Sequence, residues 1–169
     1  MLADSDFSAP TLDTVEDPLL LAHGVQVRML RLDGIHPRIC GNKWYKLKHN
    51  LLAAREQSAH TVLSFGGAYS NHLVALAAAS KACGLRSIGI VRGEAPRVLN
   101  PALRFMEAQG MALHYVSRSD YRNKEDSEFI EALEKRCGPF YQIPEGGSNL
   151  LGIKGCAEIA AHLQWRSEA

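Results

Sequence analysis

A lysine near the start of a helical pattern is the strongest candidate for chemistry in this chain. Lys43 lies in the segment GNKWYK (41–46) and follows Asn42, a residue type that often caps helices. The N-terminal end of a helix disfavours an ammonium group, and Lys46, one turn further on, adds a like charge. Both effects predict a lowered pKa for Lys43. Lysines of this kind attack carbonyl groups and act as acid–base groups, so Lys43 is a candidate nucleophile.

Lys43 also has a simpler interpretation. Lys43, Lys46 and Lys48 can form the solvated face of an amphipathic helix, since lysine side chains are mostly exposed. Gly41 favours the functional interpretation, because a glycine directly before the cap permits close approach to the backbone. The sequence leaves both interpretations open.

A glycine-rich turn, FGGAYSNH (65–72), provides the second candidate group. It follows a short apolar strand pattern and opens a helix, so its glycines permit a sharp turn. Ser70, Asn71 and His72 place short polar side chains beside unpaired helical N–H groups, an anion site that suits a carboxylate. Asn71 could also donate to a phenolate-like oxygen. The alternatives are that Ser70 or Asn71 only caps the helix, and that His72 is a structural histidine rather than a base.

A second glycine turn, EGGSN (145–149), follows a later strand pattern. Gly146 and Gly147 permit close approach of a ligand, although a plain strand-to-helix loop has the same composition. Neither turn fits GxGxxG, or GxxxxGK followed by Ser or Thr, the patterns of nucleotide-binding loops. A nucleotide-binding module therefore has little support.

The elements around these turns alternate between strand and helix patterns. Strands are predicted at 61–65, 86–91, 112–116 and 140–143. Helices are predicted at 42–57, 71–83, 101–109, 126–137 and 155–165. Parallel strands joined by helical crossovers form a small open α/β sheet of about four strands, with helices on both faces. Ligands of such sheets bind beyond the carboxyl ends of the strands, where both glycine turns lie.

The N-terminal part follows a different pattern. Residues 1–20 are predicted to form an irregular arm, and alternation at 25–32 predicts one further strand. The helix at 42–57 then has one apolar stripe that should face the core. Its members are Trp44, Leu47, Leu51 and Ala54.

Composition and charge exclude several classes of protein. The 169 residues include 19 basic and 18 acidic side chains, a net charge of +1, which indicates neither a nucleic-acid nor a membrane partner. The N-terminus is acidic and polar and lacks the order of a signal peptide, so a cytoplasmic protein is predicted. The four cysteines form no CxxC pair and are predicted to be buried free thiols. The seven histidines show no HxH or HExxH spacing, so no metal site is expected.

The motifs in this order resemble those of the 1-aminocyclopropane-1-carboxylate deaminase / D-cysteine desulfhydrase family. The resemblance covers residues 30–161 and includes four motifs: GNKWYKL (41–47), SFGGAYSNH (64–72), VRGE (91–94) and IPEGGSN (143–149). Members of this family are pyridoxal-phosphate enzymes with the tryptophan synthase β-like fold. The resemblance implies that pyridoxal 5′-phosphate is the cofactor.

The resemblance also implies roles for the cofactor-binding and catalytic residues. Lys43 falls on the family's Schiff-base lysine, and Lys46 falls on the second lysine of that motif, close to the cofactor. Asn71 falls on the asparagine beside the 3′-oxygen of the pyridoxal ring. Lys43 and Ser70 are the candidate catalytic residues.

The substrate site is implied in the same way. Ser70 and His72, with Asn71 between them, match the positions that receive the substrate carboxylate, and Gly146 and Gly147 match a turn facing the substrate. The substrate is expected to be a small amino acid, 1-aminocyclopropane-1-carboxylate or D-cysteine, converted to a 2-oxo acid and ammonia by deamination or desulfhydration.

Three regions are expected. Residues 1–42 should hold the N-terminal arm and a strand of the large domain, residues 43–150 the small α/β domain, and residues 151–169 the start of the return to the large domain. Family members carry a further C-terminal stretch of comparable size, so the large domain is expected to be incomplete and truncated here. Exposed apolar surface would favour a homo-oligomer. The alternative function is a truncated, non-catalytic domain without stable cofactor that binds a partner chain.

Overall fold

Four parallel strands form the central sheet of the computed structural model, which describes residues 2–163. The strands lie in the order β5-β4-β3-β6, the topology of an open sheet built from helical crossovers. Their bounds are β3 (Thr61–Gly67), β4 (Arg86–Arg92), β5 (Met111–Val116) and β6 (Tyr141–Gln142). The predicted four-stranded parallel sheet is confirmed, although β6 is shorter than the predicted strand at 140–143.

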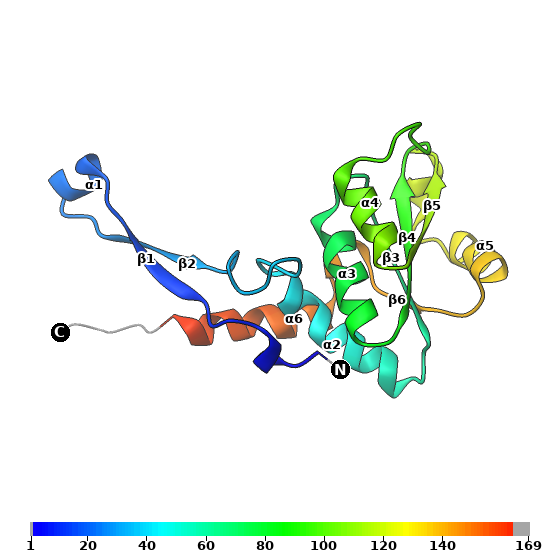
Figure 1. The fold of residues 1–169 in the computed structure, drawn as a ribbon, viewed down its shortest axis with the longest axis horizontal. Coiled ribbons are helices and arrows are strands. Elements are labelled where there is room, and N and C mark those ends of the chain that lie inside the picture. Colours follow the sequence, from blue (N-terminus) through cyan, green and yellow to red (C-terminus); the bar gives the residue numbers. More distant parts are fainter. Residues whose placement is uncertain (1, 164–169) are drawn as a thin grey trace.

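Helices cover both faces of this sheet (Figure 1). Three helices pack on one face: α2 (Lys43–Glu56), α3 (Asn71–Ala82) and α4 (Pro101–Ala108). The other face is covered by α5 (Ser127–Cys137). Neighbouring strand residues point to opposite faces, so Val62 joins the first core and Leu63 the second.

The helix ends follow the local signals of the sequence. In α4, Asn100 accepts a hydrogen bond from the Leu103 amide at 2.9 Å, and Pro101 is the first helical residue. Gly84 follows α3 with a φ of +69°, and Gly138 follows α5 with a φ of +78°. The apolar stripe of α2 is buried, as predicted, with Leu47 and Ala54 fully inaccessible to solvent.

The prediction of an irregular arm at residues 1–20 is wrong. That segment contains β1 (Thr11–Val15) and α1 (Pro18–Ala22), and β1 pairs in antiparallel register with β2 (Val27–Arg31). The Asp17 carboxylate caps α1 by accepting from the Leu19 amide at 2.8 Å. The two-stranded ribbon of β1 and β2 extends away from the α/β unit (Figure 1). The predicted strand at 25–32, observed as β2, thus pairs with β1.

The last described helix also begins earlier than predicted. Helix α6 (Leu150–Ala157) starts at residue 150 rather than 155, because Asn149 accepts a hydrogen bond from the Gly152 amide at 2.9 Å. A 3-10 helix (Glu158–His162) follows it. The end of the predicted helix, residues 164 and 165, lies outside the described residues.

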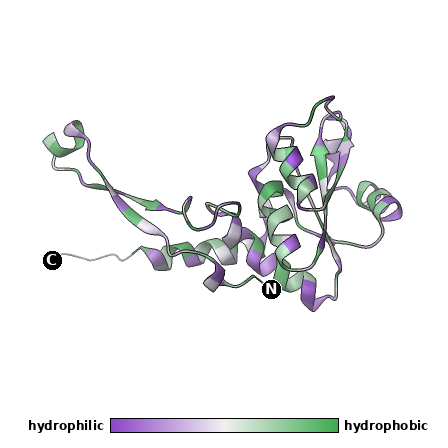
Figure 2. Cartoon of the chain, viewed as in Figure 1, coloured by the Kyte–Doolittle hydropathy of each residue, from purple (hydrophilic) through white to green (hydrophobic). Residues whose placement is uncertain are grey.

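Hydropathy follows this arrangement (Figure 2). Hydrophobic residues are concentrated in the strands and in α3 and α4, and a second group lies at the outer end of the ribbon in α1. There, Leu19 and Leu21 are each 67% exposed. Of the helices within residues 2–163, none combines the length and the apolar character needed to cross a membrane.

Candidate active site

Lys43 is the first residue of α2 and lies half-buried at the end of the helix. Its Nζ donates a hydrogen bond to Asn42 Oδ1 at 2.8 Å, and no ion pair among the described residues includes it. Asn42 was predicted to cap α2, but its side chain makes no capping hydrogen bond and holds the lysine instead. Gly41 precedes them with a φ of +64°.

The pKa of Lys43 is lowered from its ordinary value, in the direction that the sequence predicts. Burial is the largest cause, and the charge of Lys46 is the second. The thiols of Cys156 and Cys40 partly oppose the effect. The sequence predicted the contribution of Lys46, but burial depends on elements that pack over the helix end from elsewhere in the chain.

His72 is buried on α3 and lies beside this lysine-bearing helix. Its Nε2 is 2.9 Å from Ser64 Oγ, which itself donates to the Pro144 carbonyl at 3.3 Å. Because the serine proton is used in that bond, Nε2–H is the donor and Nδ1 is an unprotonated acceptor. Nδ1 is buried and has no hydrogen-bond partner among the described residues.

His72 is neutral over the physiological range. Burial lowers its pKa to about 3, and the charges of Lys43 and Lys46 act in the same direction. The imidazole therefore presents a lone pair and no charge. The prediction of a hydrogen-bonded histidine is confirmed, whereas its role as a base or substrate ligand stays a prediction.

Gly147 joins the second glycine turn to the same site. A Cβ at this position would lie 3.1 Å from Lys46 Cβ and 3.5 Å from His72 Cε1, and the residue has a φ of +67°. Gly146, directly before it, has a φ of +70°. The structure thus brings together Lys46, His72 and Gly147, which come from three separate motifs.

Ser70 and Asn71 lie at the start of α3. Ser70 Oγ accepts from the Leu73 amide at 3.2 Å, which confirms the interpretation of Ser70 as a helix cap. Asn71 is exposed, and its side chain makes no hydrogen bond to the described residues. A Cβ at Gly66 would stand 2.5 Å from Ser70 Oγ, so the turn requires glycine there.

Sequence reasoning missed two polar groups that support this site. Ser64 interrupts the apolar run of strand β3 between Leu63 and Phe65, and this interruption was the available signal for its bond to His72. Asn50 donates to the Lys46 carbonyl at 2.8 Å and accepts from Asn149 Nδ2 at 2.7 Å. These bonds tie the lysine helix to the segment that follows the second glycine turn.

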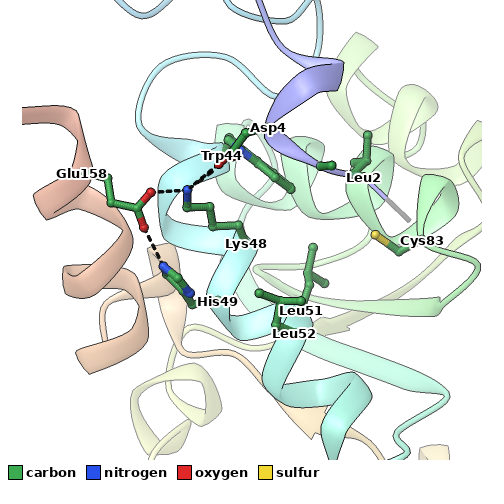
Figure 3. Close-up of a pocket in the computed structure, with 10 residues that line it drawn as sticks. Leu2, Asp4, Trp44, Lys48, His49, Leu51, Leu52, Cys83 and Glu158 are labelled. Atoms are coloured by element: carbon green, nitrogen blue, oxygen red, sulfur yellow. Dashed lines mark hydrogen bonds and ion pairs between the residues drawn. The ribbon is translucent and has the colours of Figure 1, made fainter. Parts of the chain in front are cut away.

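Lys48 does not belong to a solvated lysine face. Its side chain is 9% exposed and pairs with Asp4 at 3.1 Å and with Glu158 (Figure 3). Burial lowers the pKa of Lys48, but the hydrogen bonds that Lys48 donates to the two carboxylates, together with their charges, more than offset this, so the pKa is raised. Trp44 Nε1 also donates to Asp4 at 2.7 Å (Figure 3). Nothing local in the sequence indicated this network, because its partners lie 44 and 110 residues from Lys48.

The thiols and potential metal ligands form no further centre. All four cysteines are free, as predicted, but none is buried: Cys40 is exposed and the other three are half-buried. Within residues 2–163, no three His, Cys, Asp or Glu side chains come together in a group that could hold a metal ion.

The chain has a curated relative in a plant. It is 32% identical over 154 residues to the mitochondrial bifunctional D-cysteine desulfhydrase/1-aminocyclopropane-1-carboxylate deaminase of Arabidopsis thaliana. That match covers 85% of this chain and 38% of the relative. The chain therefore spans less than half the length of this relative. No protein-family model matches the chain.

Solved structures give the same result for the fold. The crystal structure of a 1-aminocyclopropane-1-carboxylate deaminase homologue superposes with a TM-score of 0.75 at 26% identity, over 96% of this chain and 50% of that one. A pyridoxal 5′-phosphate-dependent aspartate racemase has a TM-score of 0.67 at 23% identity, over 92% of this chain and 45% of that one, and this likeness concerns the fold alone. The resemblance predicted from the motifs is confirmed: the chain is a homologue of the 1-aminocyclopropane-1-carboxylate deaminase / D-cysteine desulfhydrase family.

Proposed function

We propose that this chain supplies the lysine and the carboxylate-binding turn of a pyridoxal-phosphate-dependent deaminase or desulfhydrase. The substrate is a small amino acid of the 1-aminocyclopropane-1-carboxylate or D-cysteine type. The observation that carries the proposal is the amine of Lys43, half-buried with a lowered pKa and without a carboxylate partner among the described residues. Such an amine is ready to react with an aldehyde.

The residues present fit a pyridoxal group. The buried acceptor Nδ1 of His72 has no partner among the described residues, which leaves it available to a ligand. Gly147 keeps the space beside Lys46 free of a side chain. In this proposal Lys43 and Lys46 would hold the cofactor, and the exposed amide of Asn71 would donate to the 3′-oxygen carried by its ring. The cofactor supplies an electron sink for the charge that develops at the substrate Cα.

The protein residues bind the substrate and move the proton. The helix start at Ser70, Asn71 and His72 receives the substrate carboxylate through the backbone N–H groups of Asn71 and His72, since the Ser70 amide already donates to the Gly67 carbonyl. Gly146 and Gly147 allow the substrate to approach the turn. The Lys43 amine takes a proton at or near Cα and returns it later. One water is consumed, and the products are a 2-oxo acid and ammonia, together with hydrogen sulfide where the substrate is D-cysteine. Ser70, already held as the helix cap, is the second catalytic residue of the proposal.

The regional organisation is part of the same proposal. Residues 43–150 form the small domain, residues 1–42 carry a strand of the large domain, and residues 151–169 begin the return to it. A homo-oligomer that covers the exposed leucines of α1 stays a prediction.

The test is the reaction of the chain with added pyridoxal phosphate. Borohydride reduction followed by peptide mass mapping should place the adduct at Lys43, and Lys43→Ala should remove both the adduct and the visible absorbance band. Lys81→Ala, which removes an exposed lysine from the end of α3, is the matched control and should leave both intact. Labelling spread evenly over surface lysines would instead favour a non-catalytic domain that binds a partner chain.

A further inference from the structure

A second pocket lies at the carboxyl ends of β3 and β4, outside the lysine site. Its volume is about 590 Å³, and it opens beside Gly67 and Arg92, which pair with each other in the sheet register. Neither Lys43, Lys46 nor His72 lines it. With the motifs of the proposed active site the pocket shares Gly67 and Ala68 of the first glycine turn and Glu145 of the second.

The walls of the pocket are strongly basic. Four cations line it: Arg92, Arg118, Arg122 and Lys124. The carboxylate of Glu145 is the single acid in the lining, and it lies 3.7 Å from Lys124. The three arginines form no ion pair with any carboxylate within residues 2–163. The positive charges of the three arginines are not neutralised by ion pairs, and this arrangement favours an anionic ligand.

Tyr121 provides a polar group at the buried side of this pocket. The residue is 3% exposed, and its hydroxyl has no hydrogen-bond partner among the described residues. Arg92 and Lys124 both approach its ring, with their cationic groups 5.6 and 5.5 Å from the ring centroid. Leaving a buried hydroxyl unpaired is costly, so this one indicates a missing acceptor.

The Tyr121 hydroxyl keeps its proton and can therefore donate a hydrogen bond to a ligand. Burial is the main cause of its raised pKa, and the Glu145 carboxylate raises the pKa further, first as a hydrogen-bonding neighbour and then through its charge. The approach of Glu145 is too long or too bent for an ordinary hydrogen bond, so it leaves the hydroxyl without a full partner. The hydroxyl therefore stays protonated at neutral pH. An oxyanion in the pocket would accept hydrogen bonds from this hydroxyl and from the guanidinium groups.

We propose that this pocket binds a small molecule through a dianionic oxyanion group, a phosphate or a pair of carboxylates. Arg92 and Arg122 supply charge-assisted hydrogen bonds, and Tyr121 supplies a neutral donor from the buried side. Four cations against one carboxylate leave an excess of three positive charges, which favours a dianion over a monoanion. The site needs no pyridoxal phosphate, so it stands independently of the proposed catalytic function.

The test titrates the full chain with inorganic phosphate and, separately, with malonate at constant ionic strength. Binding is followed through amide shifts at Gly67, Arg92 and Tyr121 in nitrogen–proton NMR spectra. Arg92→Ser should weaken binding by roughly tenfold or more, the range expected for one charge-assisted hydrogen bond. The matched control is Arg86→Ser, because Arg86 is exposed at the opposite end of the same strand.

A second pair of variants isolates the hydroxyl. Tyr121→Phe should weaken binding several-fold while the fold stays intact, because only an unpaired hydroxyl is removed. Tyr115→Phe is its control, since the Tyr115 hydroxyl is also buried without a partner but does not line the pocket. The anion that binds more tightly identifies the source of the ligand group. Absence of saturable binding for both anions, or equal affinity in all five proteins, overturns the proposal.

Discussion

At the scale of single residues, burial controls the chemistry of His72. The imidazole is 3% exposed and bonds only through Nε2 to Ser64. Protonation would place a charge in a site that already faces two lysines. The folded state therefore keeps His72 neutral, and this has a consequence for stability.

We predict that His72 makes stability depend on pH below neutrality. The folded pKa is about 3 against an ordinary value of 6.5, so between these values the unfolded chain binds a proton that the folded chain excludes. The free energy of unfolding must therefore fall as the pH decreases through this window, by at most about 1.4 kcal/mol for each pH unit. Urea titrations between pH 7 and pH 5 measure this slope.

The variant His72→Gln isolates the effect. Glutamine keeps a donor toward Ser64 but does not titrate, so the slope should flatten. His114, whose pKa is also lowered, mainly by burial, contributes in the same direction and remains in both proteins. An unchanged slope in His72→Gln would show that this imidazole is not the group responsible.

At the scale of elements, two glycines set how closely α6 packs on α2 and on the second glycine turn. A Cβ at Gly155 would lie 1.8 Å from the Tyr45 carbonyl oxygen, and one at Gly152 would lie 2.0 Å from that of Gly147. These are contacts with backbone, which cannot rotate away. The close packing also keeps Asn149 within reach of Asn50, and so fixes the second glycine turn beside the lysine helix.

We predict that Gly155→Ala destabilises the protein despite the better helix propensity of alanine. Propensity favours alanine by about 1 kcal/mol, but the helices must separate, and overpacking of this kind costs about 1–3 kcal/mol or more. Urea denaturation should show a lower midpoint. Gly34→Ala is the control, because Gly34 has open space around it and an ordinary φ. A Gly155→Ala protein more stable than the wild type would contradict the close packing.

At the scale of the whole molecule, Lys48 links both ends of the described chain to α2. Asp4 comes from the N-terminal segment and Glu158 from the C-terminal one, and both accept from the same ammonium group (Figure 3). Phe7 stacks on Trp44 with a centroid distance of 4.3 Å, so the N-terminal segment also has an apolar contact. The Ser8 amide donates a hydrogen bond to the Ile35 carbonyl at 2.9 Å. Hydrogen exchange of this amide therefore indicates whether the N-terminal segment stays packed against the rest of the chain.

We predict that Lys48→Met loosens the N-terminal segment while the sheet stays intact. The partner carboxylates are 70% and 40% exposed and can return to water, so global stability should change by less than about 1 kcal/mol. Hydrogen exchange at Ser8 should become faster, with unchanged protection in β3 and β4. Lys81→Met, at an exposed lysine, should leave both unchanged. Equal exchange at Ser8 in both variants would show that Lys48 does not hold the segment.

The sequence by itself determined the parallel sheet and most helix ends. Strand alternation, the Asn100–Pro101 start of α4 and the glycine after α3 act within a few residues, so they can be read locally. The motifs around Lys43 and Ser70 were likewise contiguous, and they pointed to the family to which the similar proteins belong. Asp17 before Pro18 was also a local signal, and the arm prediction failed by missing it.

Only the tertiary structure decided which polar groups are buried and with which partners. Lys48 lies in the same lysine-rich segment as Lys43, yet it is buried because carboxylates from both ends of the described chain reach it. Tyr121 became a candidate donor because β4 placed Arg92 beside its ring. Burial and charge compensation depend on residues distant in sequence, and the sum of those contacts exists only once the chain has folded.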